Sequence, residues 1–146
     1  MSSKTSHLIQ SFVNTLVQDI QSYQKLETLL KQQKPLYFTF EVDKLEHNIA
    51  RQQPLLHQLQ QHAHHRSQIM ARLKLSADHI GIERLFSALP PPAGEKIRHL
   101  WSQLEKLVKC CQALNQENGQ TTANFHELVS SLNCSEQHTY TEKPAG

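Results

Sequence analysis

The stretch that decides the fold runs from Ile97 to Leu132 and reads IRHLWSQLEKLVKCCQALNQENGQTTANFHELVSSL. Eleven of its positions follow one another in alternating steps of three and four residues, and nine of the eleven are apolar. This pattern indicates one helix that offers a single seam to partner helices. At about 1.5 Å per residue the helix spans roughly 50 Å, which predicts an elongated helical bundle. The core positions are Ile97, Leu100, Leu104, Leu107, Cys111, Leu114, Asn118, Thr121, Phe125, Leu128 and Leu132.

The composition supports one all-α domain. A chain of 146 residues is short enough for a single domain, and its four glycines argue against a turn-rich β fold. The 15 basic and 13 acidic residues are interspersed without a polybasic block, so we expect no nucleic-acid binding. No run of about 18 apolar residues occurs, and the N-terminus lacks the build of a signal peptide. We therefore expect a cytoplasmic protein without membrane insertion.

The cysteines do not predict a metal site or a nucleophile. Cys110, Cys111 and Cys134 are an odd number without metal-ligand spacing, which is typical of a reducing compartment. We expect packing or surface thiols, with Cys111 on the seam. The chain also has no glycine-flanked serine and no glycine-rich phosphate loop. An enzyme is not predicted.

Ten histidines are an unusual feature, and four of them, His57, His62, His64 and His65, lie close together. Pairs on one helix occur in zinc sites, but such sites need further ligands and a desolvated surrounding shell. The neighbouring residues are glutamine and arginine, which are typical of a solvated face. We therefore expect adventitious metal affinity only, and no cofactor.

The first helix is expected over about residues 5–34. Serine and threonine near Lys4 to Ser6 can cap its start, and Pro35 should end it near Lys34. The apolar joint after it, Leu36 to Phe38, either plugs the end of the bundle or forms an exposed docking patch. The expected seam consists of Ile9, Val13, Leu16, Ile20, Tyr23, Glu27 and Leu30, flanked by Phe12 and Leu26.

The second helix is expected over about residues 41–75. Pro54 lies inside it, but the apolar seam keeps one phase on both sides, which favours one kinked helix. The alternative is a separate helix over residues 41–53. The expected seam consists of Val42, Leu45, Ile49, Gln52, Leu56, Leu59, Ala63, Arg66, Met70 and Leu73.

A short connecting helix is expected over about residues 78–89, followed by three prolines that act as a stiff spacer. The third long helix should cover about 95–132, so that the antiparallel three-helix bundle, or coiled-coil hairpin, occupies residues 1–134. Residues 135–146 change to polar composition and should form a flexible tail. Tyr140 in that tail is either without a role or an anchor for a partner pocket.

The long seam is interrupted at Asn118 and Gly119. A glycine inside a helix costs about 1 kcal/mol relative to alanine, and a buried asparagine needs a hydrogen-bond partner. One interpretation is that Asn118 fixes the register, or that Gly119 ends the helix and a second helix covers Ala123 to Leu132. The other is a weakened surface on which another chain's helix can lie.

Three segments resemble the FlgN family of flagellar export chaperones. They are LVKCCQALNQENG at 107–119, the pair LETLLKQQ at 26–33 and LLHQL at 55–59, and the Thr139-Tyr140 tail. The resemblance implies a type III export chaperone that binds the C-terminal amphipathic helices of hook-filament junction proteins, which are FlgK-like and FlgL-like. It also implies delivery of these clients to the cytoplasmic domain of the export gate FlhA.

The resemblance also implies particular contacts. Tyr140 would contact the export gate, and no cofactor would be needed. The alternative function is a coiled-coil structural or adaptor protein that self-associates through the same seam, and a homodimer fits either function. The client surface implied on the third helix consists of Leu114, Asn118, Gly119, Thr121, Phe125, Leu128 and Leu132.

Overall fold

The computed structural model describes the backbone of residues 2–136 and the side chains of residues 2–121 and 123. Within these residues the chain forms four α-helices and no strand, which confirms the all-α prediction. The helices are α1 (Ser3–Phe38), α2 (Val42–Arg72), α3 (His79–Ser87) and α4 (Pro91–Glu136). None of the described helices combines the length and apolar character that a bilayer crossing needs.

Helix α1 does not end near Lys34 as the sequence predicts, but passes through Pro35 to Phe38. Pro35 has no N–H and therefore removes one helix hydrogen bond. The turn beyond it is held by Tyr37, which is only 6% exposed and whose hydroxyl accepts a hydrogen bond from the Gln33 amide at 3.2 Å. Burial of this turn outweighs the missing hydrogen bond.

The residues of the apolar joint after Pro35 differ in burial, so neither of the two interpretations holds for all of them. Tyr37 is buried and Leu36 is half-buried, so both help to close the end of the α1–α2 hairpin. Phe38 is 67% exposed and does not plug it. The chain then reverses through Phe40, whose positive φ of 54° places it in the left-handed region that side-chain-bearing residues rarely adopt.

Prolines lie inside or at the start of two further helices. Pro54 lies within α2, which is one helix from Val42 to Arg72, and so the alternative break after residue 53 is wrong. The expected proline spacer is also wrong in part, because α4 begins at Pro91. The first turn of a helix does not use its N–H groups, so Pro91 and Pro92 fit there.

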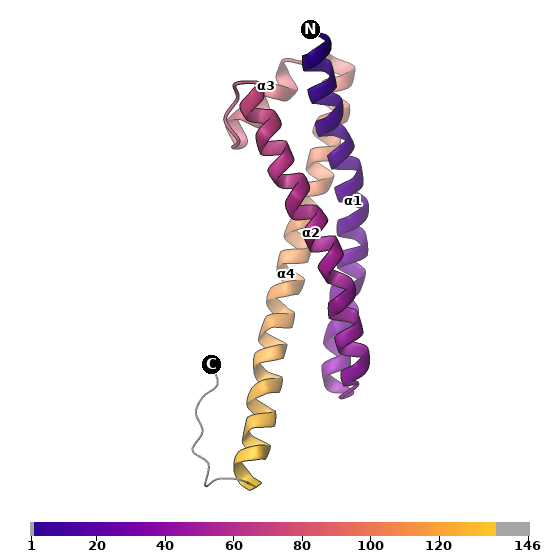
Figure 1. The fold of residues 1–146 in the computed structure, drawn as a ribbon, viewed down its shortest axis with the longest axis vertical. Coiled ribbons are helices and arrows are strands. Elements are labelled where there is room, and N and C mark those ends of the chain that lie inside the picture. The colour runs from indigo at the N-terminus through magenta and orange to yellow at the C-terminus, as the bar shows by residue number, and fades with distance from the viewer. Residues whose placement is uncertain (1, 137–146) are drawn as a thin grey trace.

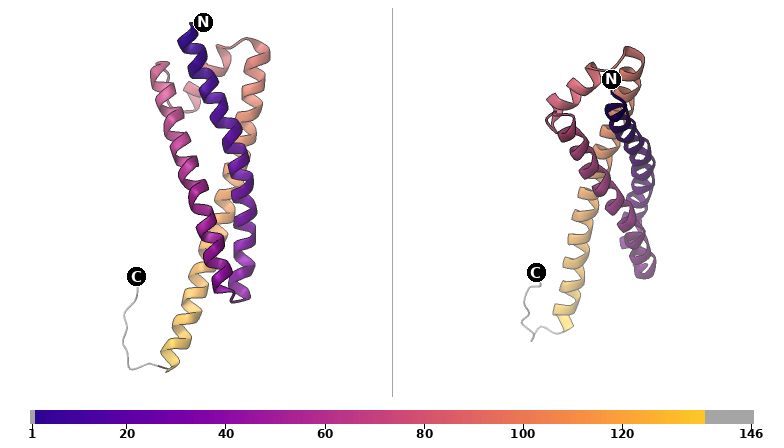
Figure 2. Two further views of the ribbon diagram at one scale, coloured as in Figure 1. Left: turned by 45° about the vertical axis from the view of Figure 1, so that its right-hand side comes forward. Right: turned by 45° about the horizontal axis from the view of Figure 1, so that its top comes forward.

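Helix α1 lies between the other two long helices in the packing. It packs along both α2 and α4, and α3 packs against α4, whereas α2 and α4 make few contacts with each other within the described residues. Figures 1 and 2 show α4 running in the same direction as α1, and α2 running back along α1 in the opposite direction. The core at the N-terminal end of α1 joins all four helices, with Phe12, Leu16, Ile69, Ile82 and Leu104 among its buried residues.

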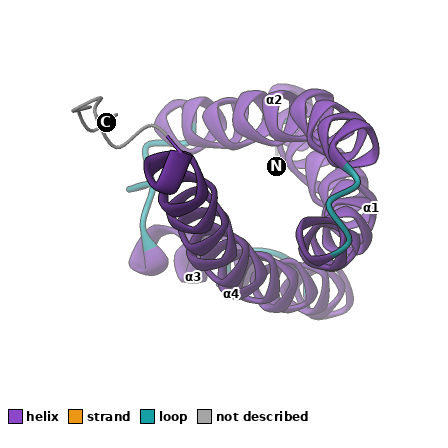
Figure 3. Cartoon of the chain, turned by 90° about the horizontal axis from the view of Figure 1, so that it is seen from below, coloured by secondary structure: helices purple, strands orange, loops and turns teal. Residues whose placement is uncertain are grey.

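The register between α1 and α4 is constant over several turns. Cys111 contacts the carbonyl of Tyr23 and Asn118 contacts that of Leu30, each at a separation of 88 residues. By this offset Phe38 is level with residue 126 (38 + 88), so the last ten residues of α4 (127–136) pass beyond the end of α1. Figure 3, seen from below, shows the end of α4 well apart from the α1–α2 turn.

The predicted seam of α4 is confirmed wherever its side chains are described. The side chains of eight of the eleven predicted positions, from Ile97 to Thr121, are described, and all eight are buried or half-buried. The fully buried ones are Ile97, Leu104, Cys111, Asn118 and Thr121.

Candidate binding groove between α2 and α4

Helix α2 packs only in part with the seam that the sequence predicts. Seven of the ten expected positions are buried or half-buried, but Val42, Leu56 and Ala63 are exposed, and neighbouring positions one residue earlier are also buried or half-buried. The earlier positions add the polar side chains of Asn48 and His62 to this interface. The observed seam is buried or half-buried at Leu45, Asn48, Ile49, Gln52, Leu55, Leu59, His62, Arg66, Ile69, Met70 and Leu73.

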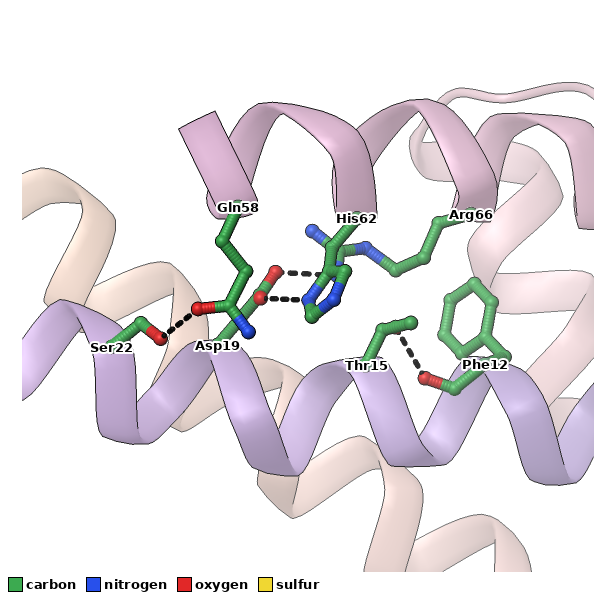
Figure 4. Close-up of polar contacts among 7 residues, drawn as sticks. All are labelled: Phe12, Thr15, Asp19, Ser22, Gln58, His62 and Arg66. Atoms are coloured by element: carbon green, nitrogen blue, oxygen red, sulfur yellow. Dashed lines mark hydrogen bonds and ion pairs between the residues drawn. The ribbon is translucent and has the colours of Figure 1, made fainter. Parts of the chain in front are cut away.

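A buried carboxylate explains this choice of face. Asp19 of α1 is 0% exposed, and its two oxygens accept hydrogen bonds from Nδ1 of His62 at 2.6 Å and Nη1 of Arg66 at 2.7 Å (Figure 4). The His62 and Arg66 side chains are 20% and 12% exposed. The expectation of a solvated histidine face is therefore wrong for His62, although His57, His64 and His65 are exposed.

Two further polar contacts hold α2 on α1 closer to the hairpin turn. The Asn48 amide donates to the carbonyl of Leu29 at 3.0 Å, and the Gln52 amide donates to Oε1 of Gln33 at 2.8 Å. Asn48, Gln52 and Gln33 are all buried. Because buried amides must keep their partners, these bonds fix the rotation of α2 about its own axis.

Sequence reasoning missed the side chains on α1 that receive these contacts. They form a second set in three-four spacing on α1, beside the predicted apolar seam. The signal was small polar residues recurring at core spacing, which the search for apolar residues passed over. The set consists of Thr15, Asp19, Ser22, Leu29 and Gln33 together with Phe12 and Leu26, which the sequence placed beside its seam, and all seven are buried.

The apolar stripe of α2 faces an open groove. Leu56, 43% exposed, lines a cavity of about 210 Å³ that also contacts Leu30 of α1 and Val108 of α4. Two helical turns further along α2, Ala63 and Trp101 of α4 line a second cavity of about 340 Å³. We call the surface between α2 and α4 that holds these two cavities, with α1 as its floor, the inner groove. The described lining of the first cavity contains no charged residue: Tyr23, Leu26, Leu30, Gln52, Leu56, Val108, Cys111, Gln112 and Asn115.

The thiols of Cys110 and Cys111 beside the inner groove are protonated and weakly reactive at neutral pH. Burial raises the pKa of Cys111 to about 11. Cys110 donates a hydrogen bond to Oε2 of Glu27 at 3.0 Å, which raises the pKa of that thiol and lowers the pKa of the carboxyl. Neither Cys110 nor Cys111 is therefore a thiolate nucleophile at neutral pH. We interpret the inner groove as a binding surface.

The family model for FlgN protein matches residues 1–140. The chain belongs to the FlgN family. Its fold is similar to the crystal structure of a Pseudomonas aeruginosa protein assigned as a flagella synthesis protein FlgN, with a TM-score of 0.69 and 25% sequence identity over 82% of this chain and 91% of that one. No curated protein sequence matches the chain. Family and fold together support a role for this FlgN-family chain in flagellum assembly.

Asn118 of this FlgN-family chain is a contact within the fold. It is 3% exposed, and its amide donates to the carbonyl of Leu30 at 2.9 Å. Helix α4 continues through Gly119, so the interpretation that Gly119 ends the helix is wrong. The observed geometry favours a register role for Asn118.

The other residues expected to contact a client are distributed unevenly. Leu114 is half-buried against the core cluster that contains Leu26 and Leu30, Thr121 is buried, and Gly119 is exposed. The remaining three, Phe125, Leu128 and Leu132, lie where only the backbone of α4 is described, and Tyr140 lies outside the described residues. Their role as partner contacts stays a prediction.

Proposed function

We propose that this FlgN-family chain is a cytoplasmic type III export chaperone for hook-filament junction proteins of the FlgK and FlgL kind. It binds their C-terminal amphipathic helices, prevents premature assembly, and delivers them to the cytoplasmic domain of FlhA. The observation that carries the proposal is the exposed apolar pair Leu56 and Ala63 of α2, which lines the inner groove, with no charged residue in the described lining of the cavity at Leu56.

The chemistry of the inner groove suits a helix with one apolar face. An amphipathic helix recognises a groove through side chains at steps of three and four residues, and Leu56 and Ala63 repeat at the matching step of seven on the wall. Burying one leucine-sized side chain contributes about 1.5–3 kcal/mol. A few such contacts give reversible binding, which a chaperone that releases its client requires.

The projecting end of α4 extends this surface. Residues 127–136 pass beyond α1, so the described packing leaves α1 out of reach of that part of α4. Phe125 is nearly level with Val42, the exposed start of the α2 stripe, because both lie next to the end of α1. We place Phe125, Leu128 and Leu132 at the lower end of the client surface and keep Tyr140 as the proposed gate contact.

The test compares two leucine- or valine-to-glutamate variants of equal exposure. Leu56 in the inner groove is 43% exposed, and Val17 on α1, which lines none of the groove cavities, is 42% exposed. Calorimetric titration with a synthetic client C-terminal helix should show at least a tenfold loss for Leu56→Glu, because the new charge would be desolvated. Val17→Glu should bind like the unchanged chain, and equal loss in both variants would exclude the inner groove.

Two further measurements separate the proposed roles. Saturating client peptide should slow amide exchange over residues 112–132, and unchanged exchange there would contradict the proposed surface. Tyr140→Ala should leave peptide binding intact and weaken binding to the FlhA cytoplasmic domain. If light scattering instead shows a homodimer that excludes the peptide, the alternative of a self-associating adaptor is correct.

A further inference from the structure

A second groove lies between α1 and α2 on the face that α4 does not cover. It consists of two adjoining cavities of about 380 and 350 Å³ that share Leu29, Gln32 and Arg51. All of its described lining residues come from α1 and α2. We call it the outer groove, and it is separate from the inner groove of the proposed function.

The charge of the outer groove has one sign. Lys25 lines one cavity, Lys44 and His47 line the other, and Arg51 lines both, whereas no carboxylate is present in the described lining. Lys44 is neutralised by Glu41 at 2.8 Å. Lys25 and Arg51 take part in none of the ion pairs formed among the described residues.

The neighbouring lysines of α1 make this contrast clear. Lys31 pairs with Glu27 at 3.6 Å, and Lys34 pairs with Glu117 of α4 at 3.5 Å. The chain thus pairs the cations on the α4 side of α1, whereas Lys25 on the other side has no carboxylate partner in the part of the chain that the structure describes. A cleft lined by one sign of charge raises the local concentration of ligands of opposite charge.

Apolar side chains line the same groove as the two cations. Leu29 is 6% exposed and Leu55 is half-buried, and the rings of Pro35 and Pro54 line the same groove. The surface therefore combines a cation on each helix with an apolar floor. A nucleic acid would use the cations but leave this floor unused, whereas a peptide with carboxylates around an apolar side chain matches both.

We propose that the outer groove binds an acidic segment of a partner protein, with carboxylates on Lys25 and Arg51 and an apolar side chain on Leu29 and Leu55. Arginine favours this ligand because its planar group can hold a carboxylate through two parallel hydrogen bonds. The site is independent of the client, since the two grooves lie on different faces of α1 and α2. A second protein can therefore bind while the inner groove is filled.

The test is fluorescence anisotropy with the full chain and a labelled synthetic peptide in which aspartate and glutamate flank leucine. The peptide should bind, and its asparagine and glutamine counterpart should bind at least tenfold more weakly. Arg51→Gln and Lys25→Gln should each weaken binding about tenfold. Lys109→Gln, an equal loss of charge at an exposed position of α4, and Leu56→Glu should leave it unchanged.

Three outcomes would overturn the proposal. One is no loss in either Arg51→Gln or Lys25→Gln when circular dichroism shows both to be folded. Another is equal loss in Lys109→Gln, which would indicate general attraction between charges. The third is binding of a single-stranded RNA of the same charge with the same dependence on Arg51, which would show a site for any polyanion.

Discussion

Removal of the Asp19 carboxylate is the sharpest test of how α2 is held. Asp19→Ala leaves His62 and Arg66 in an interface where they are 20% and 12% exposed, with no carboxylate to accept their hydrogen bonds. Breaking a buried ion pair on one side costs about 3–5 kcal/mol. The partial exposure of both partners favours the lower end, about 3 kcal/mol.

Urea unfolding followed by circular dichroism measures this loss. With a slope of about 2 kcal/mol/M, a loss of about 3 kcal/mol lowers the midpoint by about 1.5 M. Asp43→Ala is the control, because Asp43 is exposed in the first turn of α2 and should contribute below about 1 kcal/mol. A loss below about 1 kcal/mol in Asp19→Ala would refute the reasoning, since the carboxylate would then be effectively solvated.

Replacing the whole cluster separates stability from specificity. The triple variant Asp19→Leu, His62→Leu and Arg66→Met should recover the stability lost in Asp19→Ala, because apolar replacements of buried ion pairs are often neutral or stabilising. It should also bind the client peptide more weakly, since α2 is then free to turn Leu56 toward α1. A stable triple variant with full peptide binding would show that the polar contacts do not choose the open face of α2.

Three smaller predictions test other features. Gly119→Ala should stabilise the chain by about 1 kcal/mol and raise Tm by about 2–4 °C, because a Cβ there meets nothing within 4 Å; Gly94→Ala, whose Cβ would lie 2.8 Å from a backbone oxygen, should lower Tm in the same calorimetry. Hydrogen bonds from Ser76 and Gly81 lower the pKa of the Asp78 carboxyl, which caps the N-terminus of α3. This cap should therefore persist below pH 4 and be lost only as the pH falls through the lowered pKa. The chemical shift of the Gly81 amide in NMR spectra measures this loss. Burial raises the pKa of Cys111 to about 11, so iodoacetamide at pH 8 should label this thiol only in urea. The free energy of unfolding should fall as the pH rises from about 8.5 toward about 11, because the unfolded chain releases the thiol proton at the lower pH.

The sequence predicts the part of the fold that depends on one apolar pattern. All eight described seam positions of α4 are where the spacing places them, since the pattern and the packing report the same burial. The helix ends were less predictable. Local rules stop α1 at Pro35, but the partner of Tyr37 lies in the same helix and its burial depends on the folded hairpin, which those rules do not include.

The candidate site was predictable only in part, and the reason lies in α2. Its sequence contains two overlapping seams, one with Leu56 and Ala63 and one with Asn48 and His62. Counting apolar residues selects the first. The structure uses the second because Asp19, 43 residues away in sequence from His62, provides a partner that no local pattern reveals.

This failure of the apolar count is itself informative about function. The polar contacts in the α2 seam stabilise it less than apolar packing would, because each buried polar group must first be desolvated. These contacts nevertheless keep Leu56 and Ala63 exposed beside α4. A chain that only needed to be stable would bury Leu56 against α1, whereas a chain that receives another helix needs that face exposed and held at a fixed rotation. The contacts of Asp19 and Asn48 meet both requirements of the inner groove.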